Sequence, residues 1–255
     1  MLLDAILIVL RETLEAGVLV SVLASIGTRQ QLSLRWLWSA FGAGLFGAAL
    51  IAINLRAISD WFDGVGQEVV DAMLQYAVYL LLLALLIGLR RGADHWLKSC
   101  MIATVALTIA REGSEILLFF STYLRANGEL VRALTSGFVG LMIGLSVGIL
   151  CYFVLTITLP QRIARTAQKI VLPLLAAGMT MQATQLLQQA DWLPSTEPIW
   201  DSGGLLAEQS LPGQLAYAVF GYEATPTAIE VGVYVGALAL IVLALAVSTA
   251  WRRAK

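Results

Sequence analysis

The chain has 255 residues, of which 59% are hydrophobic and only 13% are charged, and its mean hydropathy is +0.82. Soluble domains carry about 25% charged residues, so a water-soluble protein of this length has no means of hiding so much apolar surface. The formal net charge of −1 gives no electrostatic reason to expect a nucleic-acid partner. Composition therefore predicts an all-α polytopic membrane protein.

Seven stretches have the roughly 20 mostly apolar residues that a spanning helix needs. In chain order they are 3–26, 37–57, 70–89, 100–123, 134–158, 168–189 and 227–250. The third and sixth stretches are the least regular, because Asp71 lies at the start of the third and Pro173 and Gly178 interrupt the apolar run of the sixth. The long segment 191–226 is rich in Pro, Gly and Trp, and its apolar parts predict a short interfacial helix there.

The distribution of basic residues predicts the orientation of these spans, because cytoplasmic loops carry an excess of Lys and Arg. Most of them fall in the first, third and fifth connections and in the C-terminal tail. The N-terminus is therefore expected outside and the C-terminus in the cytoplasm, and the compact length fits a bacterial inner membrane. The opposite connections are acidic, which would concentrate cations at the outer face or only keep these loops hydrophilic.

Two copies of the pattern Arg-Glu-x-x-Glu lie inside apolar stretches. The first consists of Arg11, Glu12 and Glu15, and the second consists of Arg111, Glu112 and Glu115. In each copy the residues three and four positions apart share one face of a helix. A charged side chain at the bilayer centre costs about 2.5–3.5 kcal/mol, so all six are expected to face the protein interior.

The offset between the two motifs predicts an internal repeat. The second and fifth stretches are both glycine-rich, and small residues at such spacing allow close helix packing. Each half then has three spans, so the second half crosses the membrane in the opposite direction, as in many secondary transporters. The predicted organisation is a single transmembrane domain, 1–255, made of repeats 1–98 and 99–190, an extracytoplasmic loop 191–226 and a seventh helix 227–250.

The motif charges favour a cation site where the two antiparallel helices meet. Four carboxylates and two guanidinium groups leave about two negative charges, which a divalent cation would neutralise and a trivalent cation would nearly neutralise. Carboxylates without Cys or His favour hard cations, and the single histidine, His95, lies in a connection. The residues alone leave open iron, manganese, magnesium, a proton relay, or two structural ion clusters that only fix helix packing.

With these motifs the sequence resembles the high-affinity iron permease family, the oxidase-dependent iron transporters. The resemblance covers nearly the whole chain and includes "QEVVDAML", "IWDSGGLL" and "FGYEATPTAIEV". Thr13 and Ser114 stand where the family commonly has glycine and leucine, and Asp71 stands where a glutamate is common. None of these differences removes a carboxylate from the chain.

The resemblance implies that iron is bound by the motif glutamates as transported substrate, with no resident cofactor. The metal ligands would be Glu12, Glu15, Glu112 and Glu115, supported by the charges of Arg11 and Arg111. The further acidic residues would form the entrance or a relay toward that site, and they are Glu68, Asp71, Asp201 and Glu230.

Other classes of protein compete with a permease. An enzyme is disfavoured, because the chain shows no Cys/His constellation, nucleophile elbow or phosphate-binding loop. A membrane scaffold that anchors an iron-handling partner is the second alternative, and such a scaffold would tolerate loss of the motif glutamates. The resemblance also implies the lipid bilayer, an extracytoplasmic iron oxidase or iron-binding protein, and a homo-oligomer as partners.

Overall fold

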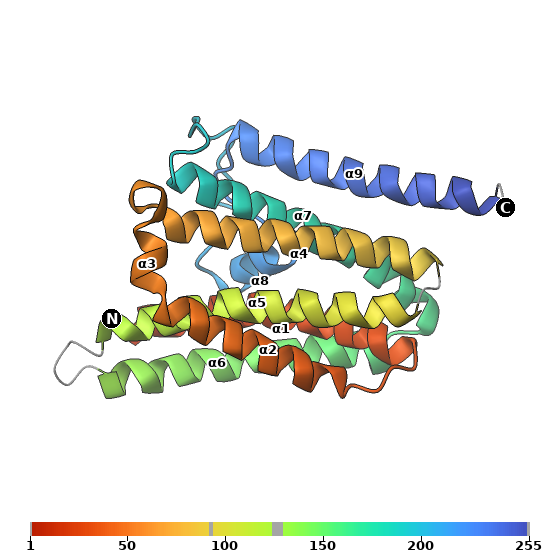
Figure 1. Cartoon of the computed structure of the whole chain (residues 1–255), viewed down its shortest axis with the longest axis horizontal. Coiled ribbons are helices and arrows are strands. Elements are labelled where there is room, and N and C mark those ends of the chain that lie inside the picture. Colours follow the sequence, from red (N-terminus) through yellow and green to blue (C-terminus); the bar gives the residue numbers. More distant parts are fainter. Residues whose placement is uncertain (1, 92–93, 124–129, 254–255) are drawn as a thin grey trace. The chain divides into compact units, whose positions relative to one another are not determined.

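The structure is a computed structural model that describes residues 2–91, 94–123 and 130–253 (Figure 1). Within these ranges the chain is built of helices and their connections, and an isolated bridge pairs Pro198 with Thr227. The fold is therefore all-α, as the composition predicted.

The helices follow one another along the chain with short connections, except for the segment before α8. They are α1 (Leu2–Arg29), α2 (Trp36–Ile53), α3 (Leu55–Ser59), the 3₁₀ turn η1 (Trp61–Gly64), α4 (Gly66–Arg91), α5 (Asp94–Tyr123), α6 (Leu130–Phe153), the π-helical turn η2 (Val154–Thr158), α7 (Gln161–Gln189), α8 (Leu211–Phe220) and α9 (Ala228–Arg253). The helix α8 confirms that the predicted 191–226 segment contains a short helix.

Five helices are long and apolar enough to cross a membrane, namely α2, α4, α6 with η2, α7 and α9. The helices α1 and α5 are just as long, with 28 and 30 residues. Each 18-residue stretch of either helix contains at least three charged residues, because the motifs lie near their middles. The chain is an integral membrane protein, and the count of seven spans stays a prediction.

Pro173 and Gly178 do not break the helix of the sixth predicted span. The helix α7 runs without a break through both residues and begins earlier than expected, directly after Pro160. Neighbouring helices and polar side chains commonly compensate for a proline within a membrane helix. At Gly178 a Cβ atom would lie 3.0 Å from the backbone nitrogen of Gly221, so glycine allows the end of α8 to approach α7 closely.

Two other predicted spans end differently from the sequence expectation. The second stretch, 37–57, divides at Asn54 into α2 and the short α3. The fifth stretch leaves α-helical geometry after Phe153 and finishes as the π-helical turn η2. Hydropathy does not reveal the change after Phe153, because that segment remains apolar, whereas Asn54 and Arg56 lie at the division of the second stretch.

The helices form two compact units. Unit 1 contains Met1–Ala57 and Val105–Gln168, and unit 2 contains Ile58–Thr104 and Lys169–Lys255. Both Arg-Glu-x-x-Glu motifs belong to unit 1. Each unit combines segments from both predicted repeats, and the inverted relation between those repeats stays a prediction.

In unit 1 the glycines of α6 allow this helix to lie directly against α1 (Figure 1). A Cβ atom at Gly140 would be only 2.4 Å from the carbonyl oxygen of Ile6. Further along, the Ser21 hydroxyl donates a hydrogen bond of 2.6 Å to the carbonyl oxygen of Gly148. Close glycine packing of this kind holds the first motif helix in place.

The glycines of α2 have the same role against α5. A Cβ atom at Gly44 would be 2.6 Å from Cβ of Ile109, and one at Gly47 would be 2.8 Å from Cβ of Ala110. Each motif helix is therefore packed against a glycine-containing helix. This confirms the interpretation of the two glycine-rich stretches as packing surfaces.

We expect Gly140→Ala to lower the unfolding temperature in detergent, because overpacking a close contact costs typically about 1–3 kcal/mol. The matched control is Gly42→Ala on α2, where nothing lies within 4 Å of the added Cβ atom. At that site alanine should leave the unfolding temperature unchanged or raise it slightly. Equal effects of the two substitutions would contradict the close approach of α6 to α1.

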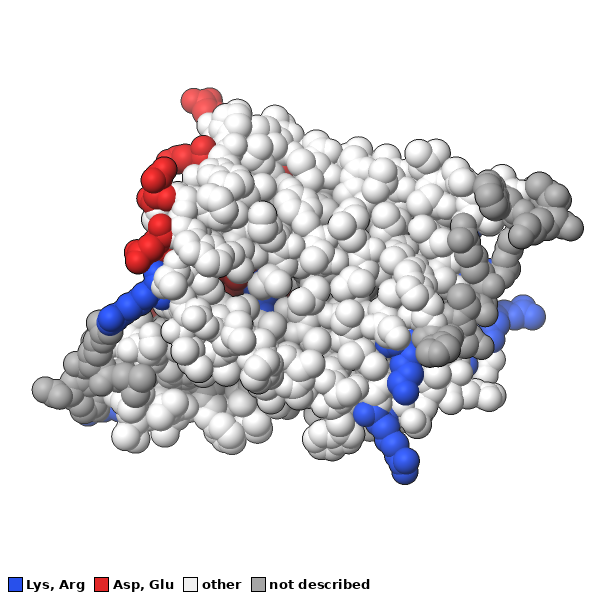
Figure 2. Space-filling model, viewed as in Figure 1, with Lys and Arg blue, Asp and Glu red and all other residues white. Residues whose placement is uncertain are grey.

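The acidic residues of unit 2 gather at the end where α4 begins and α7 ends, as Figure 2 shows for one face. They lie in the α3–α4 connection and in the segment between α7 and α8, and the exposed ones include Asp60, Asp63, Asp191, Glu197 and Asp201. The sequence assigns both of these segments to the outer face. The orientation of the termini stays a prediction.

Candidate metal site

The two motif helices bring three carboxylates together inside unit 1. Glu12 and Glu15 lie one turn apart on α1, and Glu112 faces them from α5. Each offers one carboxylate oxygen, and these atoms lie within 4.8 Å of one another. The residues are 5%, 1% and 2% exposed, respectively. Within the described part of the chain this is the group of acidic side chains placed to hold a metal ion.

Arg111 is the cation that holds this group together. Its Nη1 atom lies 2.7 Å from Oε1 of Glu112 and 3.4 Å from Oε2 of Glu15. Its Nη2 atom lies 2.8 Å from Oε1 of Glu115, one turn along α5. One buried guanidinium group thus bridges carboxylates from both helices, which fixes α1 against α5.

The first motif arginine is placed differently from the second. The side chain of Arg11 is 46% exposed, whereas that of Arg111 is 7% exposed. Arg11 pairs with Glu15 within α1, at 3.3 Å between Nε and Oε1. The sequence treats the two arginines as equivalent supporting charges, but only the second is enclosed with the carboxylates.

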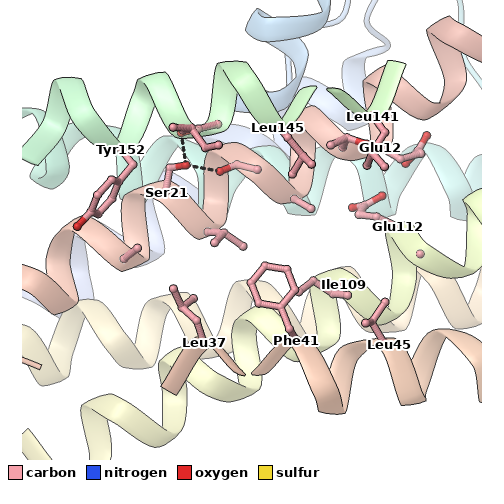
Figure 3. Close-up of a pocket in the computed structure, with 18 of the residues that line it drawn as sticks. Glu12, Ser21, Leu37, Phe41, Leu45, Ile109, Glu112, Leu141, Leu145 and Tyr152 are labelled. Atoms are coloured by element: carbon pink, nitrogen blue, oxygen red, sulfur yellow. Dashed lines mark hydrogen bonds between the residues drawn. The ribbon is translucent and has the colours of Figure 1, made fainter. Parts of the chain in front are cut away.

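Two carboxylate oxygens of the group have no hydrogen-bond partner, namely Oε2 of Glu12 and Oε2 of Glu112. Both residues line a cavity of about 380 Å³ in unit 1. Figure 3 shows the two side chains close together at one end of this cavity, with Tyr152 toward the other end. A buried oxygen that has no hydrogen-bond partner costs the folded protein about 1–3 kcal/mol. A ligand bound at these two atoms would remove that cost.

Glu115 stands apart from the three clustered glutamates. Its side chain is partly exposed and is paired with Arg111, and it does not belong to the set whose oxygens lie within 4.8 Å. Three of the four predicted ligands therefore converge. A metal role for the fourth stays a prediction.

The chemistry of the donor set suits a hard cation. Carboxylate oxygens are the ligands that Fe²⁺, Mn²⁺ and Mg²⁺ accept, and no Cys or His belongs to the group. Three residues do not complete an octahedral shell, so water or further oxygens would fill the remaining positions. An incomplete protein shell allows an ion to be released as well as bound.

The four predicted entrance or relay residues all lie in unit 2. Glu68 and Asp71 lie about one turn apart on the same face at the start of α4. Asp71 is buried, and Oε2 of Glu68 has no hydrogen-bond partner. The motif glutamates belong to unit 1, and a relay from these four residues to them stays a prediction.

Glu230 and Asp201 have local structural roles. The carboxylate of Glu230 accepts a 2.9 Å hydrogen bond from the backbone nitrogen of Thr227, and the Thr227 hydroxyl accepts one from the nitrogen of Glu230. This reciprocal pair is a capping box, which stabilises the start of α9. Asp201 is exposed and accepts a 2.8 Å hydrogen bond from the nitrogen of Gly203, as in an Asx turn.

Unit 2 also contains a buried polar pair that joins α4 to α7. The Gln75 amide on α4 donates a 2.7 Å hydrogen bond to Oε1 of Gln182 on α7, and both residues are buried. A glutamine inside the apolar run "DAMLQYAVYL" is the signal that could have found it, because buried amides in membrane helices need partners.

A second side-chain contact in unit 2 predicts that the stability of the protein depends on pH. The Gln185 amide on α7 donates to the carboxylate of Glu223, which lies between α8 and α9. Burial above all, and then the nearby Glu208 carboxylate, raises the pKa of Glu223 from 4.5 to about 7, against the lowering effect of Gln185.

A raised carboxyl pKa means that the folded protein binds more protons than the unfolded chain between pH 4.5 and about 7. We therefore expect the unfolding temperature to fall as the pH rises through this window. Glu223→Gln keeps the shape and removes the charge, so its unfolding temperature should change less over the same window. Parallel pH profiles of the two proteins would contradict this role of Glu223, and Glu197→Gln at an exposed position serves as the control.

The fold and the site define a class of protein: an integral membrane protein with a buried carboxylate cluster on two of its long helices. The family model described as the iron permease FTR1 family matches residues 2–253 of the chain. The chain therefore belongs to the iron permease family, and iron transport and permease activity are the properties of that family.

The chain also matches curated relatives over most of their length. A ferrous iron permease EfeU from Escherichia coli O6:H1 (strain CFT073) is 26% identical over 255 residues, which cover 89% of each chain. Proteins of that name from Shigella sonnei (strain Ss046) and Yersinia pestis are 27% and 26% identical, covering 89% of this chain and 89% and 87% of their own. No solved structure matches the chain.

Proposed function

We propose that this protein imports iron across a bacterial inner membrane through the carboxylate cluster of Glu12, Glu15 and Glu112. The observation that carries the proposal is the pair of buried, unpartnered oxygens on Glu12 and Glu112, which face each other from the two motif helices. Membership of the iron permease family supports iron as the substrate.

The charge of the site favours a divalent ion. Glu12, Glu15 and Glu112 together with the enclosed Arg111 carry a formal net charge of about −2. A ferrous ion neutralises this charge, whereas a bare ferric ion would leave an excess positive charge in a region of low dielectric constant. The relatives are named ferrous iron permeases, which agrees with this reasoning.

Transport requires that the ion enter and leave the same cluster. Arg111 keeps Glu15, Glu112 and Glu115 in place when no ion is bound, since it supplies a positive charge that the carboxylates would otherwise lack. An arriving Fe²⁺ binds the free oxygens of Glu12 and Glu112. It then shares the remaining oxygens of the cluster with Arg111. Direction follows the predicted orientation, with entrance from the acidic outer face and release to the cytoplasm.

Two other functions remain as alternatives. A carrier for Mn²⁺ or Mg²⁺ would use the same hard oxygen ligands. A membrane scaffold for an extracytoplasmic iron oxidase or iron-binding protein would use the acidic outer segments and leave the carboxylate cluster idle. Such a partner, and a homo-oligomer, are compatible with a permease as well.

The test is cation uptake by the purified protein in sealed lipid vesicles. Radioactive Fe²⁺, kept reduced with ascorbate, should accumulate in vesicles that contain the protein and not in empty ones. Unlabelled Fe²⁺ should compete strongly, whereas equal concentrations of Mn²⁺ and Mg²⁺ should compete weakly. Stronger competition by Mn²⁺ or Mg²⁺ would assign the protein to the other cation, and no uptake of any of the three would favour the scaffold.

A further inference from the structure

The cavity that begins at Glu12 and Glu112 extends well beyond the carboxylates. Its floor is formed by α1 from Glu12 to Ala24, and its sides are formed by α2, α5 and α6. Apart from the two carboxylates, its lining is almost entirely apolar, as the side chains drawn in Figure 3 illustrate. Three clustered ligands do not require such a space, so the cavity needs an occupant of its own.

The rim of the cavity is formed by exposed apolar side chains on two candidate membrane spans. On α2 its rim carries the exposed Phe41 and Leu45, and on α6 the exposed Leu145 and Ile149. Both helices are candidate membrane spans, and little of either is buried within the protein. An apolar groove whose rim faces hydrocarbon does not fill with water, because apolar cavities stay dry.

The dimensions fit one lipid tail. From Glu12 to Ala24 the groove follows α1 for about 18 Å at a rise of about 1.5 Å per residue. One leaflet of the hydrocarbon core is roughly 15 Å deep, half of about 30 Å. A single acyl chain that enters at one membrane surface therefore reaches the level of the carboxylates.

The charges at the Tyr152 end of the groove fit an anionic headgroup. Leu34 and Leu37 line the groove, and the exposed Arg35 lies between them in the sequence. Arg29 also lies at this end, where it donates a 2.7 Å hydrogen bond to the carbonyl oxygen of Leu155 on η2. The sequence contains no Asp or Glu in 20–53 or in 141–168, the two segments that form this part of unit 1.

We propose that the groove between α2 and α6 binds one acyl chain of an anionic phospholipid, with its phosphate held near Arg35. The lipid belongs to the leaflet next to the α1–α2 connection. Its tail fills the apolar space beside Glu12 and Glu112 and closes the bilayer side of the carboxylate cluster. This lipid site does not depend on which cation the protein carries.

The test uses phosphatidylglycerol with a photoactivatable diazirine near the end of one acyl chain. The full-length protein is placed in phosphatidylcholine nanodiscs that contain a minor fraction of this lipid, irradiated, digested and mapped by mass spectrometry. Adducts should concentrate on residues that line the groove, such as Val20, Leu37 and Leu145, relative to the exposed face of α9. Equal labelling of the groove and of α9 would overturn the proposal.

Variants separate tail binding from headgroup binding. Val20→Phe fills the floor of the groove and should reduce groove adducts at least about tenfold, a difference of about 1.4 kcal/mol. The matched control, Val242→Phe on the exposed face of α9, should not reduce them. Arg35→Gln should weaken labelling by phosphatidylglycerol but not by a diazirine phosphatidylcholine, and Arg56→Gln is its control.

Each alternative occupant has its own signature in the same nanodiscs. If water fills the groove, Ala24→Cys will react with a membrane-impermeant thiol reagent, and lipid adducts will be absent. If a second copy covers it, Phe41→Cys will form a disulfide-linked dimer, and lipid adducts will be absent. Either result would overturn the proposal, and unfolding temperatures of all variants identify any that fail to fold.

Discussion

Glu112→Gln is expected to abolish iron uptake while the protein still reaches the membrane at normal levels. Glu112 is 2% exposed, contacts Arg111 at 2.7 Å, and has a second oxygen free for the ion. Loss of a residue that only orients a ligand costs about 10–100-fold in metal affinity, so loss of a direct ligand should cost at least that much. Glutamine keeps the volume and an oxygen, and removes the charge that binds the cation.

The measurement is initial uptake of radioactive Fe²⁺ into vesicles, normalised to the amount of protein. Glu12→Gln should behave as Glu112→Gln, because both residues offer an unpartnered buried oxygen. Glu115→Gln tests the fourth predicted ligand and should be less severe, because Glu115 lies outside the converging set. Glu197→Gln, at an exposed position, is the matched control and should transport normally.

If Glu12→Gln and Glu112→Gln both take up iron at the wild-type rate, the proposed metal site is contradicted. The two motifs would then be ion clusters that fix helix packing, which the residues alone left open. An equal loss in Glu115→Gln and Glu112→Gln would instead show that all four motif glutamates bind the ion during passage. The comparison of these variants therefore tests whether the ion uses all four motif glutamates, as the sequence suggests, or mainly the three that converge in the structure.

Much of the fold follows from the sequence, because apolar length and helical spacing are local properties. The long apolar runs predicted the helices, and the glycines at Gly140 and Gly44 predicted close packing without naming the partners. The cluster of Glu12, Glu15 and Glu112 follows from the same logic, since charges in a membrane helix must face inward.

The parts that the sequence did not predict depend on tertiary contacts. The sequence marked Pro173 as an irregularity of the sixth stretch, whereas α7 continues through it without a break. Glu230 was predicted to belong to the entrance or relay, which stays a prediction, and the structure also makes it part of a helix cap with Thr227. The spacing Thr-x-x-Glu is a local signal of that cap.

The two motif arginines give the clearest case, because their local sequences are alike and their environments are not. Arg111 is enclosed and bridges three glutamates, whereas Arg11 is nearly half exposed. We expect Arg111→Gln to lower the free energy of unfolding by about 3–5 kcal/mol, because removal of one partner leaves buried carboxylates without their counter-charge. Arg11→Gln should cost about 0–1 kcal/mol, as for a solvent-exposed pair.

The measurement is unfolding by SDS titration from mixed micelles, with uptake measured on the same preparations. If Arg111 acts by neutralising the cluster, removal of one carboxylate should restore stability to Arg111→Gln. The double variant Arg111→Gln/Glu112→Gln should therefore be more stable than Arg111→Gln alone, and the coupling energy of this cycle measures the pair. It should still fail to transport, because the ligand is missing. Equal stability of Arg11→Gln and Arg111→Gln would show that the two motifs are as symmetric in the folded protein as they are in the sequence.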